Sequence, residues 1–475
     1  MRKIIIGLAI FILSLGIIAG GLYFWYRTGN LQKTIVNEVV KKEITSNPAE
    51  MSAIQEVLGF SQPRTYLLLF LNNTELRPGG GFIGEYAVIQ VDKGIPHILK
   101  VEGTELLDNY APQDVLPAPP APLAEYVGVK KWGFRDSNWS PDFPSSSVES
   151  MKLFRAENGT SANQIDSVIG FTPTVLEEIL KITGPITVDG KEYNSENFTQ
   201  QLEYEVEFGY AQQGLDFNQR KKVLSDLTSA MLSKIQGDVF KNWNAYFGLI
   251  QEMLAQKQIV AYSSYPEAEN ILLAKGWAGE IKQTAGDYIL WVDANMAALK
   301  TDKVVTRTLS YSIAPTSSDR FVGTLKMDYQ NNGTFSQFTT RYRTYARIYV
   351  PIGSRFISVS GDIKSSPTST IDQGIENDKQ WFGAFTSIEP GKTGELKWQF
   401  YLAPEIAAQI KNNSYSLLAQ KQIGTIASGL TLDLDFGKPI LSATPGELPA
   451  NYGDNKYMFQ TDLRVDKDFQ IKLKE

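Results

Sequence analysis

The chain has 475 residues, of which 43% are hydrophobic and 21% are charged, and this composition is typical of a folded protein with two or three domains. The net charge of −6 argues against nucleic acid as the main partner, because binding to phosphate backbones needs a basic face. There is no cysteine and only one histidine, His97, which excludes disulfides, thiolate nucleophiles and metal sites built from several histidines. Any chemistry therefore depends on carboxylates, arginines, lysines, hydroxyls and backbone amides.

The N-terminus carries a long apolar segment. Residues 4–26 contain no charge and directly follow Arg2 and Lys3. As a helix they span roughly 34 Å, enough to cross a bilayer, and the aromatic residues 23–26 suit the membrane interface. The length and the lack of a small-residue cleavage site favour an uncleaved anchor over a signal peptide. We expect residues 1–29 to form a cytoplasmic stub and a transmembrane helix.

The next segments predict helices and then the start of a sheet. Residues 30–62 show apolar residues at three- and four-residue spacing, which predicts juxtamembrane helices. Residues 64–71 (RTYLLLFL) are apolar on both faces, as in a central strand of an α/β sheet. Residues 82–92 and 97–103 follow as a predicted hairpin, with Lys93-Gly94 at its turn.

A proline-rich stretch comes next. Residues 108–131 contain five prolines, which predicts an extended surface loop. A loop of this length is often functional, so a lid over a site is the alternative interpretation.

The chain then alternates between predicted strands and predicted helices. Residues 165–171 predict a strand, and residues 173–183 a helix that begins with a proline and ends before a glycine. The alternation continues to a predicted last strand at residues 287–295. We therefore expect residues 63–303 to form an α/β domain around a mixed sheet.

The last third of the chain has a different character. Residues 304–475 contain short alternating segments separated by turn residues, without a convincing long helix. This pattern predicts a β-sandwich of immunoglobulin-like size.

Two polar stretches are candidates for a site. In residues 72–84 (NNTELRPGGGFIG), Arg77 stands beside three glycines. Glycine-rich backbone and an arginine fork suit an anion, whereas the simpler interpretation is a tight turn. Arg135, Asp136 and Asp142 lie close together in RDSNWSPDFP, where the aspartates could hold a hard cation or could cap helices and pair with Arg135.

Several segments carry a family resemblance. The resemblance lies in segments that occur in the same order as in the family, namely residues 67–89 (LLLFLNNTELRPGGGFIGEYAVI), 134–144 (FRDSNWSPDFP) and 165–173 (IDSVIGFTP). They resemble the domain-of-unknown-function family numbered 4012, whose members are bacterial and membrane-anchored. The resemblance covers most of the chain after residue 60 and implies an anchored protein with its bulk outside the cytoplasm.

The α/β part is also similar, more distantly, to the LytR-CpsA-Psr family. That family transfers glycopolymers from a polyprenyl-pyrophosphate lipid onto the cell wall, using arginines for the pyrophosphate and aspartates for magnesium. The resemblance implies that Arg77 takes the place of the turn arginine. However, Asn73 stands where the family has an aspartate. The position of the family's second aspartate falls among residues 79–81, which are all glycine here. Magnesium is thus implied by resemblance alone, and the departures favour binding over transfer.

The resulting expectation is a single-pass cell-membrane protein that is associated with the cell envelope. It is expected to bind an envelope glycan or a polyprenyl-pyrophosphate-linked ligand, with no nucleic-acid partner. The alternative is an active glycopolymer transferase or a pyrophosphate-cleaving enzyme. We expect Arg77 and Arg135 to converge on one cavity, and we assign no catalytic residue or metal ligand. The candidate ligand-binding residues are Asn73, Glu75, Arg77, Glu85, Arg135, Asp136 and Asp142.

Overall fold

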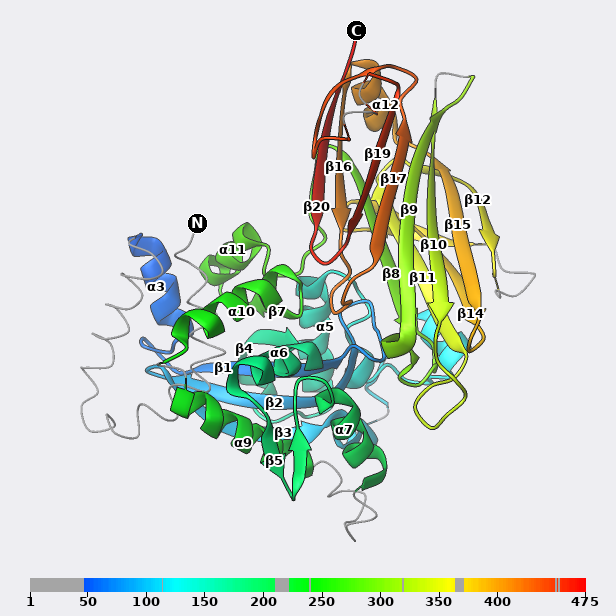
Figure 1. Cartoon of the computed structure of the whole chain (residues 1–475). Coiled ribbons are helices and arrows are strands. Elements are labelled where there is room, and N and C mark those ends of the chain that lie inside the picture. The colour runs from blue at the N-terminus through cyan, green and yellow to red at the C-terminus, as the bar shows by residue number, and fades with distance from the viewer. Residues whose placement is uncertain are drawn as a thin grey trace. The chain divides into compact units, whose positions relative to one another are not determined.

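The computed structural model of the chain (Figure 1) describes residues 47–112, 114–209, 222–238, 241–317, 320–363, 371–448, 451 and 453–475. The predicted transmembrane helix at residues 4–26 and the first part of the predicted juxtamembrane helices lie outside these ranges. Among the described residues, none of the helices has both the length and the apolar character needed to span a bilayer.

The described chain forms two compact units. The first, here called the α/β unit, comprises the described parts of residues 1–72, 82–118 and 131–280. The second, here called the sandwich unit, comprises Asn73–Gly81, Pro119–Lys130 and the described parts of residues 281–475.

The α/β unit is built on a mixed five-stranded sheet of order β3-β2-β1-β4-β7. Its central strand β1 runs parallel to β4 and antiparallel to β2. The predicted central strand and the predicted mixed sheet are therefore confirmed. The strands are β1 Arg64–Asn72, β2 Phe82–Asp92, β3 Ile95–Gly103, β4 Ile165–Phe171 and β7 Ile259–Ser263, and a separate pair is formed by β5 Ile186–Val188 and β6 Lys191–Tyr193.

Helices pack around this sheet (Figure 1). Tyr66 and Ile169 face a core shared with several helices, whereas Gly170, one residue along β4, faces Phe143 at the start of α5. Successive residues of these strands thus serve opposite faces. The helices are α3 Pro48–Val57, α4 Thr104–Tyr110, α5 Phe143–Ala156, α6 Pro173–Thr183, α7 Phe198–Tyr204, α9 Lys222–Asp238, α10 Trp243–Ala255 and α11 Pro266–Lys275, with 3₁₀ or π-helical turns at Leu123–Val127, Phe134–Asp136, Ala162–Gln164 and Glu205–Gly209.

Local signals set several of these boundaries. Lys93 and Gly94 adopt φ angles of 52° and 81° at the β2–β3 turn, as the predicted hairpin requires. Helix α6 begins at Pro173, where a missing N–H costs nothing, and ends at Gly184, which has a φ of 73°. These predictions are confirmed.

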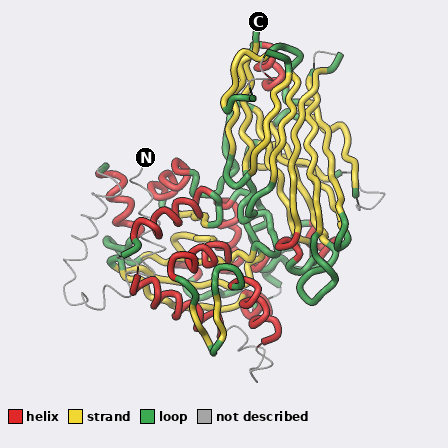
Figure 2. Tube along the Cα trace, viewed as in Figure 1, coloured by secondary structure: helices red, strands yellow, loops and turns green. Residues whose placement is uncertain are grey.

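The sandwich unit consists mainly of strands, drawn in yellow in Figure 2, which form two mixed sheets. The two sheets share one hydrophobic core. The six-stranded sheet has the order β12-β15-β10-β9-β17-β19, and the seven-stranded sheet has the order β13-β14-β11-β8-β16-β20-β18. The core joins Leu325 and Trp398 of the first sheet to Trp291 and Ile348 of the second. The elements are β8 Asp287–Asn295, β9 Val305–Pro315, β10 Phe321–Asn331, β11 Tyr342–Pro351, β12 Arg355–Gly361, β13 Asp372–Glu376, β14 Lys379–Ile388, β15 Thr393–Tyr401, α12 Pro404–Lys411, β16 Ser414–Gln420, β17 Gly429–Asp435, β18 Ile440–Thr444, β19 Lys456–Asp462 and β20 Lys467–Leu473, with a 3₁₀ turn at Thr301–Val304.

Strand β8 corrects one prediction. Its sequence pattern places it last in the α/β sheet, but it lies between β11 and β16 of the sandwich unit, with all nine residues buried. A strand buried on both faces suits the centre of any covered sheet, so the pattern alone does not identify the sheet. Folding of residues 63–303 and 304–475 as separate domains stays a prediction.

Candidate functional site

The glycine-rich segment around Arg77 belongs to the sandwich unit, as Asn73–Gly81. Its backbone bonds to β8, since the Asn295 amide donates to the Leu76 carbonyl at 2.9 Å. The Leu76 amide donates to Asp302 Oδ2 at 3.1 Å, and Asn73 Nδ2 donates to the Gly424 carbonyl at 2.9 Å. The segment is therefore an integral part of this unit.

Arg77 is buried within that segment, with an exposed fraction of 4%. Its Nη1 donates to the carbonyls of Leu76 at 3.2 Å and Asn295 at 3.1 Å, and its Nη2 lies 3.4 Å from Glu75 Oε1. The Arg77 carbonyl accepts from Gln422 Nε2 at 3.2 Å. Carbonyl acceptors and a carboxylate satisfy a guanidinium in the manner of a structural arginine.

The glycines of this segment permit a close backbone approach. Gly80 has a φ of 125°, and the facing Gly424 has a φ of 78°. A Cβ on Gly424 would lie 2.0 Å from the Gly80 carbonyl oxygen. At least one glycine is thus needed for chain packing, which agrees with the simpler interpretation of this motif.

The segment adjoins a buried ionic network in the sandwich unit. Arg307 Nε lies 2.9 Å from Asp293 Oδ2, and Arg307 Nη2 pairs with Asp302. Asp293 also accepts from Tyr329, at 2.8 Å, and Asn295 Nδ2 donates to Asp302 at 2.8 Å. The charges are densely bonded to each other and to neutral donors, as a structural network requires.

The second candidate stretch lies in the α/β unit. Arg135 Nε pairs with Asp108 of α4. Asp136 is buried, and its carbonyl accepts from the Trp132 indole at 2.9 Å. Asp142 caps α5, accepting from the amide and hydroxyl of Ser145 at 3.0 and 2.7 Å. The capping interpretation is therefore confirmed for Asp142.

The predicted site residues divide between the units. Glu85 lies on β2 opposite Phe70 and Gly103, in the same unit as Arg135. Arg77 belongs to the sandwich unit, so its convergence with Arg135 on one cavity stays a prediction. In the described ranges, no group of three or more histidine, aspartate or glutamate side chains is placed to hold a metal ion.

A buried carboxyl pair beside Arg135 was missed by sequence reasoning. Asp108 and Glu157 have exposed fractions of 6% and 3%, and Glu157 Oε1 accepts from the Phe134 amide at 2.6 Å. Burial and the adjacent Asp108 carboxyl raise the pKa of Glu157 to about 9. Asp108 and Glu157 therefore titrate as a coupled pair, which retains a proton above the usual pH range of a carboxylic acid. Glu157 lies just after α5, and only the fold brings it close to Asp108 of α4.

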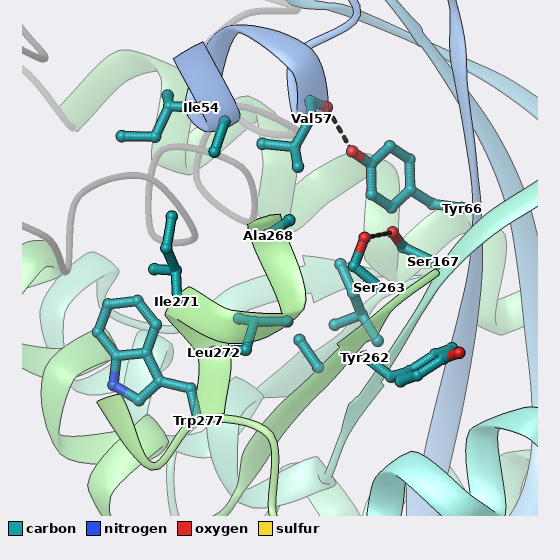
Figure 3. Close-up of a pocket in the computed structure, with 13 residues that line it drawn as sticks. Ile54, Val57, Tyr66, Ser167, Tyr262, Ser263, Ala268, Ile271, Leu272 and Trp277 are labelled. Carbon is teal, nitrogen blue, oxygen red and sulfur yellow. Dashed lines mark hydrogen bonds between the residues drawn. The ribbon is translucent and has the colours of Figure 1, made fainter. Parts of the chain in front are cut away.

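An apolar pocket in the α/β unit is a candidate for ligand binding (Figure 3). It has a volume of about 60 Å³ and lies between α3, α11 and the strands β1, β4 and β7. Figure 3 shows Ile54 and Val57 of α3 on one side and α11 on another. Its apolar walls include Ile54, Val57, Ile169, Ala268, Leu272 and Trp277.

The hydroxyls of Tyr66, Ser167 and Ser263 in these walls bond to the protein itself. The Tyr66 hydroxyl donates to the Val57 carbonyl, and Ser167 Oγ donates to Ser263 Oγ at 3.0 Å (Figure 3). Ser263 Oγ also accepts from the Tyr265 amide at 3.2 Å. The surface offered to a ligand is therefore mainly hydrocarbon. Sequence reasoning missed this pocket because its walls come from three stretches that are far apart in the chain, within residues 53–66, 167–169 and 261–277.

Comparisons with known proteins gave a match to one family model and weak similarities to solved structures. No match was found among curated proteins. The Lin1025 protein of Listeria innocua is 11% identical, with 46% of this chain and 78% of that chain covered and a TM-score of 0.25. Protein gbs0355 of Streptococcus agalactiae is 12% identical, with 46% and 75% covered and a TM-score of 0.26. Leukotriene A4 hydrolase of Saccharomyces cerevisiae is 11% identical, with 36% and 29% covered and a TM-score of 0.21.

At TM-scores this low, we draw no conclusion about fold or function from the structural similarities. The family comparison is more informative because it falls on the segments that carry the predicted resemblance. Residues 61–206, which include β1, β2 and α5, match the family described as "Protein of unknown function (DUF4012)", which supports the expected family for this part of the chain.

Proposed function

We propose that this chain is a membrane-anchored, envelope-associated protein whose α/β unit binds the hydrocarbon part of a polyprenyl-linked ligand. The uncharged residues 4–26 support the anchor, and the match over residues 61–206 supports a relation to a family of unknown function. The apolar pocket is the observation that carries the proposed binding.

The pocket favours a hydrocarbon over a polar ligand. The Ser167 and Ser263 hydroxyls bond to each other, and the Tyr66 hydroxyl bonds to Val57. A polar ligand would lose its hydration here without gaining partners. A hydrocarbon gains about 0.8 kcal/mol for each CH₂ group that it buries. A volume of about 60 Å³ suits a short branched segment, such as one end of a polyprenyl chain.

Binding is favoured over glycopolymer transfer by the partners of the two predicted arginines. Arg135 pairs with Asp108, and Arg77 lies 3.4 Å from Glu75. A carboxylate beside each guanidinium lowers the positive charge available to a pyrophosphate. Pyrophosphate recognition and magnesium-dependent transfer remain the alternative for this family resemblance.

Filling the pocket tests the proposal. Ala268 lines the pocket, whereas Ala274 on the same helix is exposed. In the full chain reconstituted in nanodiscs, we expect Ala268→Leu to weaken binding of tritiated farnesyl phosphate at least tenfold, with Ala274→Leu as the matched control. Farnesol should bind within a few-fold of farnesyl phosphate, because the chain supplies most of the affinity. Equal binding by Ala268→Leu and the wild-type protein would refute the proposed site.

Topology is tested separately. A reporter enzyme fused after Glu475 should be active only outside the cytoplasm, because the uncharged N-terminal segment is expected to be the anchor. Protection of this C-terminus from external protease in spheroplasts would contradict the proposed orientation.

A further inference from the structure

A second cavity lies in the sandwich unit, where β11 begins and β14 ends. It has a volume of about 620 Å³, within the usual range for small-molecule sites. Its walls also include the turn between β14 and β15. The polar wall residues used below are Arg341, Arg343, Asp362, Ser387, Glu389 and Lys392.

The two carboxylates of this cavity already have partners. Glu389 Oε1 lies 2.5 Å from Arg341 Nε, an ion pair in which both side chains are about half exposed. Asp362 Oδ2 accepts from the Glu395 amide at 2.9 Å. Of the three cationic side chains in the wall, Arg341 is thus the one that forms an ion pair with a carboxylate of the cavity.

Arg343 is held in place by neutral groups. Its Nη2 donates to the Tyr126 carbonyl at 2.8 Å, and its guanidinium carbon lies 5.6 Å from the centre of the Phe385 ring. Tyr126 stacks on Phe385 with ring centres 4.1 Å apart and planes at 6°. This packing restricts the Arg343 side chain, which reduces the entropy lost when the guanidinium binds a ligand.

The wall of the cavity carries three cationic side chains and two carboxylates, which gives it a net charge of +1. Within the described part of the chain, neither Arg343 nor Lys392 has a carboxylate within ion-pair distance. Ser387 adds a hydroxyl from β14, opposite Arg343 in the strand register. A restrained guanidinium, an ammonium and a hydroxyl match an anionic group carried by a hydroxylated molecule.

We infer that this cavity binds an anionic sugar, recognised through a phosphate or carboxylate group. The Arg343 guanidinium can donate a pair of hydrogen bonds to either group, and Lys392 adds a second positive charge. This inference goes beyond the proposed function, because the cavity lies in the sandwich unit and does not use the apolar pocket.

The test measures equilibrium binding of glucose 1-phosphate, glucuronate, glucose and inorganic phosphate to the full chain in nanodiscs. We expect at least one of the two anionic sugars to bind at least tenfold more tightly than glucose and than inorganic phosphate. Preference for glucose 1-phosphate would identify phosphate as the recognised group, and preference for glucuronate would identify carboxylate. Failure of both to exceed glucose, or equal binding of inorganic phosphate, would overturn the inference.

Variants place the ligand in the cavity. Lys392→Gln and Arg343→Gln should each weaken the preferred sugar about tenfold, and Arg355→Gln, at an exposed arginine of β12, should leave binding unchanged. Lys392 is exposed, so its substitution keeps the inference testable even where Arg343→Gln disturbs the Tyr126 contact. Unchanged sugar binding in folded Lys392→Gln would refute this location. Ala268→Leu should not affect sugar binding, so the two proposals fail separately.

Discussion

The two units bury their charged groups in different ways. In the sandwich unit, Arg307 lies between Asp293 and Asp302, and neutral donors complete the network. In the α/β unit, Asp108 and Glu157 share one partly exposed arginine, Arg135. In the first cluster an arginine lies between the two carboxyls and neutral groups donate to them, whereas in the second the two carboxyls lie beside each other and raise the pKa of the pair.

This difference predicts different responses to mutation and to pH. Removing the arginine from the sandwich network leaves two buried carboxylates without their cation, which is strongly unfavourable. Removing the titratable group from the carboxyl pair instead relieves a cost that grows as the pH rises. Arg307→Leu and Glu157→Gln test this comparison directly, and Gly424→Ala and Asp142→Ala extend it to backbone packing in the sandwich unit and helix capping in the α/β unit.

The largest expected effect is that of Arg307→Leu. It leaves Asp293 and Asp302 buried without their counter-charge, and we expect a loss of about 3–5 kcal/mol in the free energy of unfolding. Guanidinium denaturation of the full chain, with hydrogen exchange of β8 peptides, measures this loss. Arg355→Leu on exposed β12 is the control. A loss below about 1 kcal/mol would show that the network contributes little.

Gly424→Ala tests how tightly the Asn73–Gly81 segment is docked. The new Cβ would lie 2.0 Å from the Gly80 carbonyl oxygen at a φ of 78°, and we expect a loss of about 2–3 kcal/mol from strain and displacement. Gly391→Ala is the matched control, because its φ is 71° and no atom lies within 4 Å. Equal losses in both variants would mean that the φ angle alone is responsible.

Glu157→Gln tests the carboxyl pair through its pH dependence. The folded-state pKa of about 9 exceeds the ordinary value of 4.5, so the folded protein binds the extra proton and loses stability as the pH rises between these values. We expect the wild-type protein to lose on the order of 2 kcal/mol between pH 5 and pH 8 through this group. Glu157→Gln should remove this slope, as measured by denaturation at both pH values. Glu149→Gln, at a surface residue of the same helix paired with Lys152, should retain the slope.

Asp142→Ala has the smallest expected effect. It removes the bond from the carboxylate to the Ser145 amide at the start of α5, and we expect a loss of about 1 kcal/mol. Thermal denaturation should detect this loss, and Asp142→Ser should restore most of it. A much larger loss, or no rescue by serine, would give Asp142 a role beyond capping.

Part of the fold follows from local sequence signals. The apolar run of residues 64–71 predicts the central strand β1, and Lys93-Gly94 predicts the β2–β3 turn. Pro173 and Gly184 bound α6 as expected. These features are predictable because burial periodicity, proline and glycine act on the backbone within a few residues.

The contacts that form the candidate sites could not be predicted from the sequence. Arg77 and Arg135 stood out in the sequence as candidate ligand-binding residues, but the groups that they contact could not be identified from it. The apolar pocket could be recognised only once α3, three strands and α11 had been placed together. The cavity of the sandwich unit could be recognised only once the start of β11 was known to lie beside the end of β14. A local sequence pattern does not predict contacts between segments that are far apart in the chain.

The sequence by itself determined the alternation of strands and helices, several element boundaries and the family resemblance, because these depend on neighbouring residues. Tertiary structure decided that β8 belongs to the sandwich unit and that Arg77 contacts Asn295, 218 positions away. It also decided that Asp108 meets Glu157. The physical reason is that a sequence pattern shows which side of an element is buried, whereas the identity of the group buried against it depends on contacts between distant segments.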